Sequence, residues 1–143
     1  MQLEVRSTLA HGTITSVAHA GQYEEVVPVS YIATARPQSS SEVEAKVREY
    51  FSDIPIMIEV ARCESTFRHV LNDGTVLRGY VDNDDLGVMQ INLRFHAETA
   101  ERLGLDLENI YDNMAYARYL YERQGTQPWN ASAPCWGRYI AMR

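Results

Sequence analysis

The sequence lacks several features that would indicate a particular class of protein. No apolar run approaches the roughly 18 residues that a membrane-spanning helix needs, so we expect no membrane span. Lys and Arg form no basic run, and the formal net charge is −6, so nucleic acid is not an expected partner. The sequence shows neither a phosphate-binding glycine loop nor the Cys and His spacing of a metal site, so we expect no metal and no cofactor.

Cysteine is scarce, since the chain has only Cys63 and Cys135. Two thiols cannot supply the four ligands of a structural zinc site. The residues alone allow either two buried free thiols or one disulfide that closes a long loop.

The chain has 143 residues, of which 45% are hydrophobic, which is enough for one domain with a tail. Residues 1–40 show no helical periodicity, and the stretch 36–41 is rich in Pro and Ser. We therefore expect a flexible N-terminal arm or linker over residues 1–40 and one folded domain over residues 41–143.

Hydrophobic periodicity predicts that this domain is mainly helical, with one small β-hairpin, and so belongs to the α+β class. Ser41 followed by Glu44 predicts a capping box at the start of a first helix. Asp53 followed by Pro55 predicts the start of a second helix.

Turn residues divide the rest of the domain. The Asn-Asp-Gly sequence at residues 72–74 predicts a hairpin over residues 68–84, with a return strand at residues 75–81. We expect one helix over residues 95–103 and another that Asp112 caps and that ends at residue 124, each followed by a glycine. The tail from residue 128 onward is expected to be irregular.

Two motifs on either side of this hairpin suggest chemistry. Glu64 falls near the end of an apolar helix, where burial and the carbonyl end of the helix dipole would both raise its pKa. Such a carboxyl can donate a proton at neutral pH. The second motif, residues 85–92, reads Asp-Leu-Gly-Val-Met-Gln-Ile-Asn. Gly87 permits a close approach of the backbone, and the amide of Gln90 can both donate and accept hydrogen bonds.

The order of glutamate, hairpin and Gly-x-x-Gln motif resembles the lysozyme-like superfamily, above all the soluble lytic transglycosylases, and also c-type lysozymes and resuscitation-promoting factors. The resemblance covers residues 41–136. It implies a lysozyme-like fold with a β-hairpin wing. It also implies an enzyme that cleaves the MurNAc–GlcNAc β-1,4 bond of peptidoglycan, with Glu64 as general acid and then base.

Asp85 stands two residues before Gly87, as the catalytic aspartate does in c-type lysozymes. This spacing implies an alternative, a hydrolytic lysozyme (muramidase) that uses both Glu64 and Asp85. Asp85 equally fits a turn residue in a loop rich in Asp and Asn. A third alternative is a glycan-binding module of the same fold without activity.

The resemblance also implies roles for other residues. The expected substrate contacts are Ser65, Gly87, Met89, Gln90, Asn92, Tyr116 and Trp129. Resuscitation-promoting factors have a cysteine just before the catalytic glutamate and another near the C-terminal end of the domain, which implies a disulfide between Cys63 and Cys135. The Ala-Tyr-Asn-Ala-Gly motif that is usual in transglycosylases is missing, and residues 128–132 read Pro-Trp-Asn-Ala-Ser instead. Which residue orients Glu64 from that side is therefore open.

The expected partner is a peptidoglycan strand, and the expected state is a monomer. No signal-peptide pattern opens the chain, whereas an enzyme of the cell wall must be exported. We therefore expect a secreted or cell-envelope protein whose signal peptide is absent from this sequence.

Overall fold

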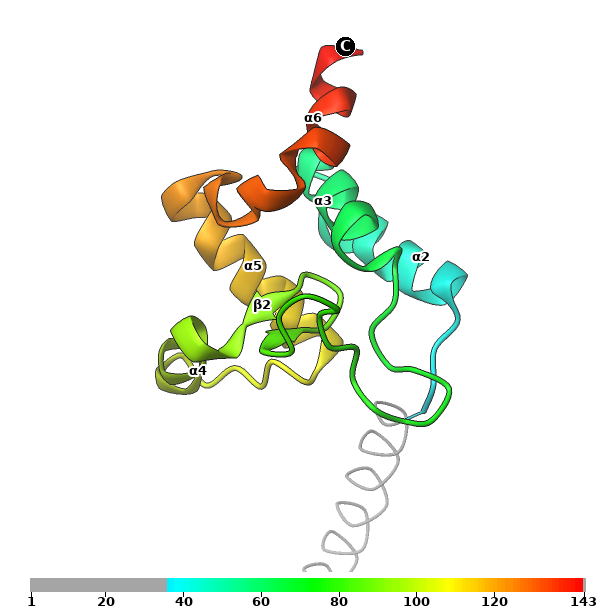
Figure 1. Ribbon diagram of the computed structural model, residues 1–143, viewed down its shortest axis with the longest axis vertical. Coiled ribbons are helices and arrows are strands. Elements are labelled where there is room, and N and C mark those ends of the chain that lie inside the picture. The colour runs from blue at the N-terminus through cyan, green and yellow to red at the C-terminus, as the bar shows by residue number, and fades with distance from the viewer. Residues whose placement is uncertain (1–35, 143) are drawn as a thin grey trace, which may run out of the picture. The chain divides into compact units, whose positions relative to one another are not determined.

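Residues 36–142 are described by the computed structural model, and those from Pro37 onward form one unit. This unit is mainly helical with a small two-stranded antiparallel sheet, which confirms the predicted α+β class (Figure 1). The predicted N-terminal arm lies almost wholly outside the described residues. Within residues 36–142, each helix is too short or too polar to cross a lipid bilayer.

Helix α2 (Ser40–Tyr50) begins with a capping box. The hydroxyl of Ser39 accepts a hydrogen bond from the backbone N–H of Glu42, and the Glu42 carboxylate accepts one from the N–H of Ser39. The prediction that Ser41 and Glu44 form this box is therefore wrong by two residues. The start of the helix has three consecutive serines and two nearby glutamates, so more than one pair fits the sequence pattern.

Helix α3 (Pro55–Ser65) carries Glu64 in its last turn. Pro55 opens the helix as predicted, but Asp53 does not cap it, because the N-cap is Ile54 and has no side-chain hydrogen bond. The Asp53 carboxylate instead accepts two hydrogen bonds from the guanidinium of Arg118, at 2.8 and 2.9 Å. A bidentate pair with Arg118 thus takes the place of the cap.

The chain leaves α3 abruptly after Ser65. Thr66 and Phe67 both have positive φ angles, of 51° and 56°, which end the helix within two residues of Glu64. Left-handed backbone is uncommon for residues other than glycine and costs about 1–3 kcal/mol for each residue. The packing around Thr66 and Phe67 must therefore hold the chain in this conformation at the end of α3.

The predicted hairpin over residues 68–84 has its turn but not its strands. Val70 and Val76 form a single β-bridge across the turn at residues 72–74. The two-stranded sheet consists instead of β1 (Asp85–Leu86) and β2 (Ile91–Asn92). Leu86 and Ile91 are buried, whereas the expected return strand ends in a tyrosine and a valine that are fully exposed. Burial therefore favours pairing within the second motif.

Asparagines cap the next two helices. Asn92 caps α4 (Leu93–Arg102), which begins two residues before the predicted position. Asn109 caps α5 (Ile110–Gln124) through hydrogen bonds from two backbone N–H groups, so the prediction that Asp112 is this cap is wrong. Asp112 lies in the first turn instead. Both helices end beside the predicted glycines.

The prediction of an irregular tail is also wrong. The tail forms a 3-10 helix, η1 (Gln127–Ser132), followed directly by α6 (Ala133–Ala141), each with a proline in its first turn. Helix α6 packs against α3, and Figure 1 shows the two side by side at one end of the unit. Trp129 and Trp136 are both buried, and the burial of these large rings anchors the tail.

Candidate active site

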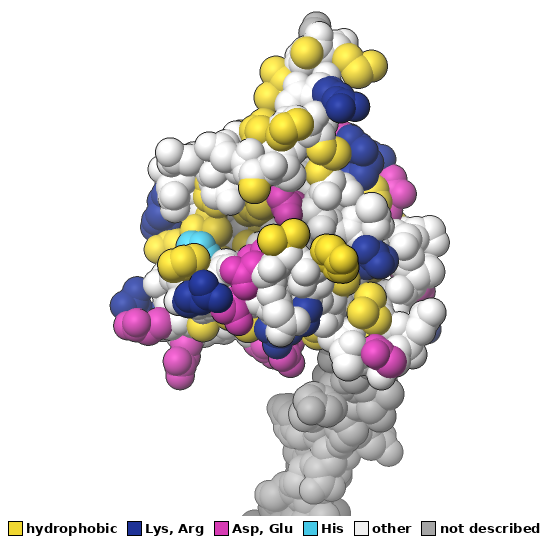
Figure 2. Space-filling model, in the orientation of Figure 1, with side chains coloured by type: hydrophobic (Ala, Val, Ile, Leu, Met, Phe, Trp, Pro, Cys, Tyr) yellow, Lys and Arg dark blue, Asp and Glu magenta, His cyan; other side chains and the backbone are white. Residues whose placement is uncertain are grey.

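A cleft of about 350 Å³ opens beside the last turn of α3. Figure 2 shows acidic, hydrophobic and histidine side chains that meet around a hollow on one face of the molecule. The cleft is lined by Glu64, Asp85, Gln90, Ile91, Asn92, Phe95, His96, Leu120, Gln124, Pro128, Trp129 and Ala131. The structure thus brings together five of the residues predicted for the site, namely Glu64, Asp85, Gln90, Asn92 and Trp129.

Glu64 is a half-buried acid in this cleft. Its Oε1 accepts a hydrogen bond from the Ser132 hydroxyl at 2.5 Å. Burial raises the pKa of Glu64 above its ordinary value of 4.5, the Ser132 bond lowers it by less, and the charge of Asp85 raises it again. The net direction is upward, as a proton donor near neutral pH requires.

Asp85 is held at the same cleft by a hydrogen bond from a neighbouring strand. Its Oδ1 accepts a hydrogen bond from the side-chain N–H of Asn92 at 2.9 Å, across the β1–β2 pair. The same amide nitrogen donates to Asp82 at 3.0 Å, and the amide oxygen of Asn92 caps α4. Asn92 therefore fixes the direction of the Asp85 carboxylate and ties it to the start of a helix.

The turn between the two strands rests on two buried polar side chains that the sequence analysis did not single out. The N–H of Val88 donates to Nδ1 of His69 at 3.0 Å, and the N–H of Met89 donates to Oδ1 of Asn113 at 3.0 Å. The amide of Asn113 also donates to the carbonyl of Leu86. These bonds satisfy backbone groups that would otherwise be buried without partners.

His69 is neutral in this arrangement. Its Nδ1 accepts a hydrogen bond, so Nε2 must carry the proton and donate it to the carbonyl of Glu108, at 2.7 Å. Burial lowers the pKa of His69, in keeping with the neutral form. The only sequence signal for this role is one histidine followed by two apolar residues, and this pattern is too common to indicate a buried hydrogen-bonding role.

The tail forms part of the lining of the cleft. The indole N–H of Trp129 donates to the carbonyl of Met89 at 2.9 Å, and the indole N–H of Trp136 donates to the carbonyl of Trp129 at 2.9 Å. Ser132 lies between these two tryptophans in sequence and contacts Glu64. Ser132 is therefore the residue that bonds Glu64 from the tail, and the sequence analysis missed it.

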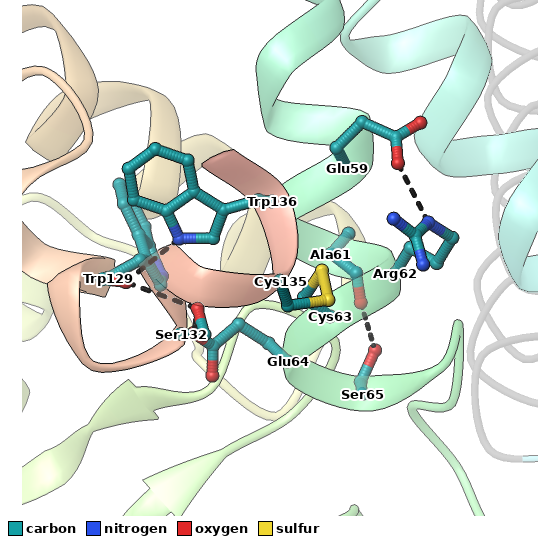
Figure 3. The surroundings of a disulfide bond; sticks show 10 residues. All are labelled: Glu59, Ala61, Arg62, Cys63, Glu64, Ser65, Trp129, Ser132, Cys135 and Trp136. Atoms are coloured by element: carbon teal, nitrogen blue, oxygen red, sulfur yellow. Dashed lines mark hydrogen bonds and ion pairs between the residues drawn. A yellow bond between two sulfur atoms is a disulfide. The ribbon is translucent and has the colours of Figure 1, made fainter. Parts of the chain in front are cut away.

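The predicted disulfide between Cys63 and Cys135 is confirmed. The two Cα atoms are 6.0 Å apart, and both cysteines are bonded. Figure 3 shows the bridge next to Glu64, between α3 and the start of α6. It ties the helix that bears the acid to the segment that bears Ser132.

The other residues predicted for the site are buried next to the cleft and do not line it. The Ser65 hydroxyl is buried and donates to the carbonyl of Ala61 at 3.0 Å, away from Ser132 (Figure 3). Tyr116 is 1% exposed, and its hydroxyl bonds Nδ1 of His96, which itself lines the cleft. Gly87 and Met89 lie in the buried turn between the strands. The substrate contacts predicted for these four residues stay predictions.

In comparisons with known proteins, no family model, curated protein or solved structure matches the chain. Among residues 36–142, His, Cys, Asp and Glu form no group of three or more that could hold a metal ion.

Proposed function

We propose that the protein is a lysozyme-like enzyme, a peptidoglycan lytic transglycosylase that cleaves the MurNAc–GlcNAc β-1,4 bond. The observation that carries this proposal is Glu64, a half-buried acid with a raised pKa that opens into a cleft. The arrangement of Glu64 before the hairpin turn, with the 85–92 motif across the cleft, supports the same family.

In the proposed reaction, Glu64 gives its proton to the glycosidic oxygen, and the bond from that oxygen to C1 of MurNAc breaks. The 6-hydroxyl of the same MurNAc then bonds to C1. The carboxylate of Glu64 takes the hydroxyl proton, so the acid is restored. The products are a GlcNAc end and a 1,6-anhydro-MurNAc end, and no cofactor takes part.

The position of Asp85 favours a second candidate, a hydrolytic lysozyme. Asp85 lines the same cleft as Glu64, and its charge contributes to the raised pKa of Glu64. In this candidate the ionised Asp85 stabilises or attacks the sugar cation, and water replaces the 6-hydroxyl. The product then has a reducing MurNAc end.

We also propose that the protein acts outside the reducing cytoplasm, in the cell envelope or after secretion. The Cys63–Cys135 disulfide supports this proposal, because disulfides persist mainly in oxidising compartments.

Digestion of purified peptidoglycan by the wild-type protein, by Glu64→Gln and by Asp85→Asn tests both candidates. We expect Glu64→Gln to lose about 10²–10⁴-fold in rate, because a general acid contributes that much. Mass spectrometry of the fragments then separates the candidates. Anhydro ends that survive in Asp85→Asn support the transglycosylase, whereas reducing ends that are lost in Asp85→Asn support the lysozyme.

The matched control is Glu98→Gln, the same substitution at an exposed glutamate of α4, which should cleave like the wild type. Undiminished cleavage by Glu64→Gln contradicts the acid role. Binding of the wild-type protein to peptidoglycan without any cleavage would instead identify a glycan-binding module.

A further inference from the structure

The hydroxyl of Ser132 lies between two acceptors. Its Oγ is 2.5 Å from Oε1 of Glu64 and 3.1 Å from the carbonyl oxygen of Trp129. A serine hydroxyl has one proton to donate, so it can serve only one of these acceptors at a time. The Trp129 carbonyl is also bonded by the indole N–H of Trp136, and so it does not depend on Ser132 for a partner. The Ser132 proton is therefore free to stay with Glu64.

We infer that Ser132 is a positioning residue that holds Oε1 of Glu64 and directs the acidic proton to Oε2. This inference rests on the proposed acid role of Glu64. When the Ser132 hydroxyl donates to Oε1, that oxygen acts as an acceptor and the proton of the acid resides on Oε2. Oε2 is then the oxygen that exchanges a proton with the substrate in the cleft.

The surroundings of Ser132 make it a rigid contact. It is the last residue of η1, which Trp129 anchors through its bond to the Met89 carbonyl. Three residues further on, Cys135 is bonded to Cys63, the neighbour of Glu64 in α3. The donor and the acceptor are thus fixed to each other through a covalent bridge as well as by packing, and such a supporting shell keeps a catalytic group in place.

A second effect follows for the protonation of Glu64. The titratable groups that share its cleft are Asp85 of β1 and His96 of α4, and η1 contributes none. The contribution of η1 is instead the hydroxyl of Ser132, which donates a hydrogen bond to Glu64 and so stabilises its ionised carboxylate. Without its hydroxyl, the ionised form loses that bond and the pKa of Glu64 rises further.

Ser132→Ala and Ser132→Thr test this inference, with Ser52→Ala as the control at an exposed serine. The carboxyl of Glu64 is titrated by NMR in protein labelled with ¹³C in glutamate, and its signal is assigned as the one missing from Glu64→Gln. We expect the pKa of Glu64 to be higher in Ser132→Ala than in the wild type. It should stay near the wild-type value in Ser132→Thr, which keeps a hydroxyl at position 132, and in Ser52→Ala, which leaves Ser132 unchanged.

Kinetics on peptidoglycan fragments provide the second measurement. We expect kcat of Ser132→Ala to fall about 10-fold with little change in KM, because a misplaced acid affects the transition state more than binding. The alkaline limb of its pH profile should move to higher pH, and Ser132→Thr should recover most of the rate. A merely structural role of Ser132 would leave the position of that limb unchanged.

The outcomes separate this inference from the proposed function. An unchanged Glu64 pKa in folded Ser132→Ala, or a Ser132→Thr variant as slow as Ser132→Ala, overturns the role of Ser132 even if the wild type cleaves peptidoglycan. A wild type that cleaves nothing overturns the proposed function. In that case a raised Glu64 pKa in Ser132→Ala still supports the contact with Ser132.

Discussion

Glu64 acquires its chemistry from residues that are far away in the sequence. Ser132, which bonds its carboxyl, is 68 residues further along the chain, and Asp85, which shares the cleft, lies on a different element. The helix itself provides only the position near its C-terminal end. The strength of the acid is thus a property of the assembled contacts around a single side chain.

Gly87 is the residue at which the turn between the strands is least tolerant. Its φ is +73°, and an added Cβ would lie 2.7 Å from both Nδ2 of Asn113 and Cε1 of His69. Gly87→Ala would therefore strain the backbone and displace the two side chains that hold the turn. We expect a loss of about 2–4 kcal/mol in the free energy of unfolding, measured by urea denaturation, from strain and overpacking together.

Gly104→Ala separates these two causes. Gly104 has a similar φ of +70°, but nothing lies within 4 Å of an added Cβ. It should lose only the backbone part, about 1 kcal/mol. If both variants are destabilised equally, the close contact at Gly87 has no energetic weight and our account of the turn is wrong.

Part of the lining of the cleft could be predicted at the level of residues, whereas the roles of these residues stay predictions. Glu64, Asp85, Gln90, Asn92 and Trp129 were expected there and do line one cleft, because their motifs have a recognisable order. Ser132, His69 and Asn113 were missed. Each acts through one or two long-range hydrogen bonds, and a single small polar residue has no periodicity or spacing that would indicate such a role.

At the scale of elements, the pairing of α3 with α6 is the contact that builds the site. The disulfide joins residues 72 positions apart and fastens the two helices beside Glu64. Helix η1, which leads into α6, then places Ser132 and Trp129 at the cleft. The tail therefore forms one wall of the cleft.

Reduction of the disulfide should weaken both the fold and the site. We expect reduction, or the double variant Cys63→Ala with Cys135→Ala, to lower the free energy of unfolding by about 2–5 kcal/mol. Urea denaturation with and without reductant measures this change. The double variant is the control, because the chain has no other cysteine and reductant should not affect it further. A wild type whose denaturation midpoint is the same in reductant would contradict the prediction.

The sequence predicted elements better at their ends than at their beginnings. Gly104 and Gly125 mark the ends of α4 and α5 as expected, since glycine readily adopts the positive φ that follows a helix. The caps of α2, α3 and α5 were each misplaced by one to three residues. Several neighbouring polar residues satisfy a capping pattern, and tertiary contacts such as that between Asp53 and Arg118 decide among them.

At the scale of the whole molecule, the acid that is proposed for catalysis reduces stability at neutral pH. Because the pKa of Glu64 is higher in the folded protein than its ordinary 4.5, folding favours the protonated form. Its contribution to stability is full below about pH 4.5 and is lost as the pH rises through the raised value. His69 has the opposite dependence, because its lowered pKa removes stability as the pH falls below 6.5.

Glu64→Gln should therefore be more stable than the wild type at pH 8 and equal to it at pH 4. Glutamine resembles the protonated acid in shape and has no charge to desolvate. We expect a higher Tm than that of the wild type at pH 8 and an equal Tm at pH 4. Calorimetry at both pH values measures it, and His69 cancels because it is present in both proteins. A variant less stable than the wild type at pH 8 would show that the ionised Glu64 does not destabilise the folded protein.

The class of the whole fold could be predicted from the sequence, but the structure of the C-terminal tail and its packing against the rest of the domain could not. Helical periodicity and one turn signal were sufficient for the α+β class, although the small sheet lies at residues 85–92 and not at the predicted residues 68–84. The tail was expected to be irregular because its two prolines and two tryptophans obscure any periodic pattern. Both prolines occupy first turns, where no N–H is required, and both tryptophans are buried against distant elements. Only the tertiary structure shows these facts.

The distance in sequence between Glu64 and its tail contacts has a consequence for the order of folding. Helices form from local contacts within about a microsecond, whereas contacts between residues some 70 positions apart must wait for a long loop to close. We therefore expect the contact between Ser132 and Glu64 to form later than α3 itself. The part of the cost of burying the acid that depends on this contact would then be met after the local structure of α3 has formed.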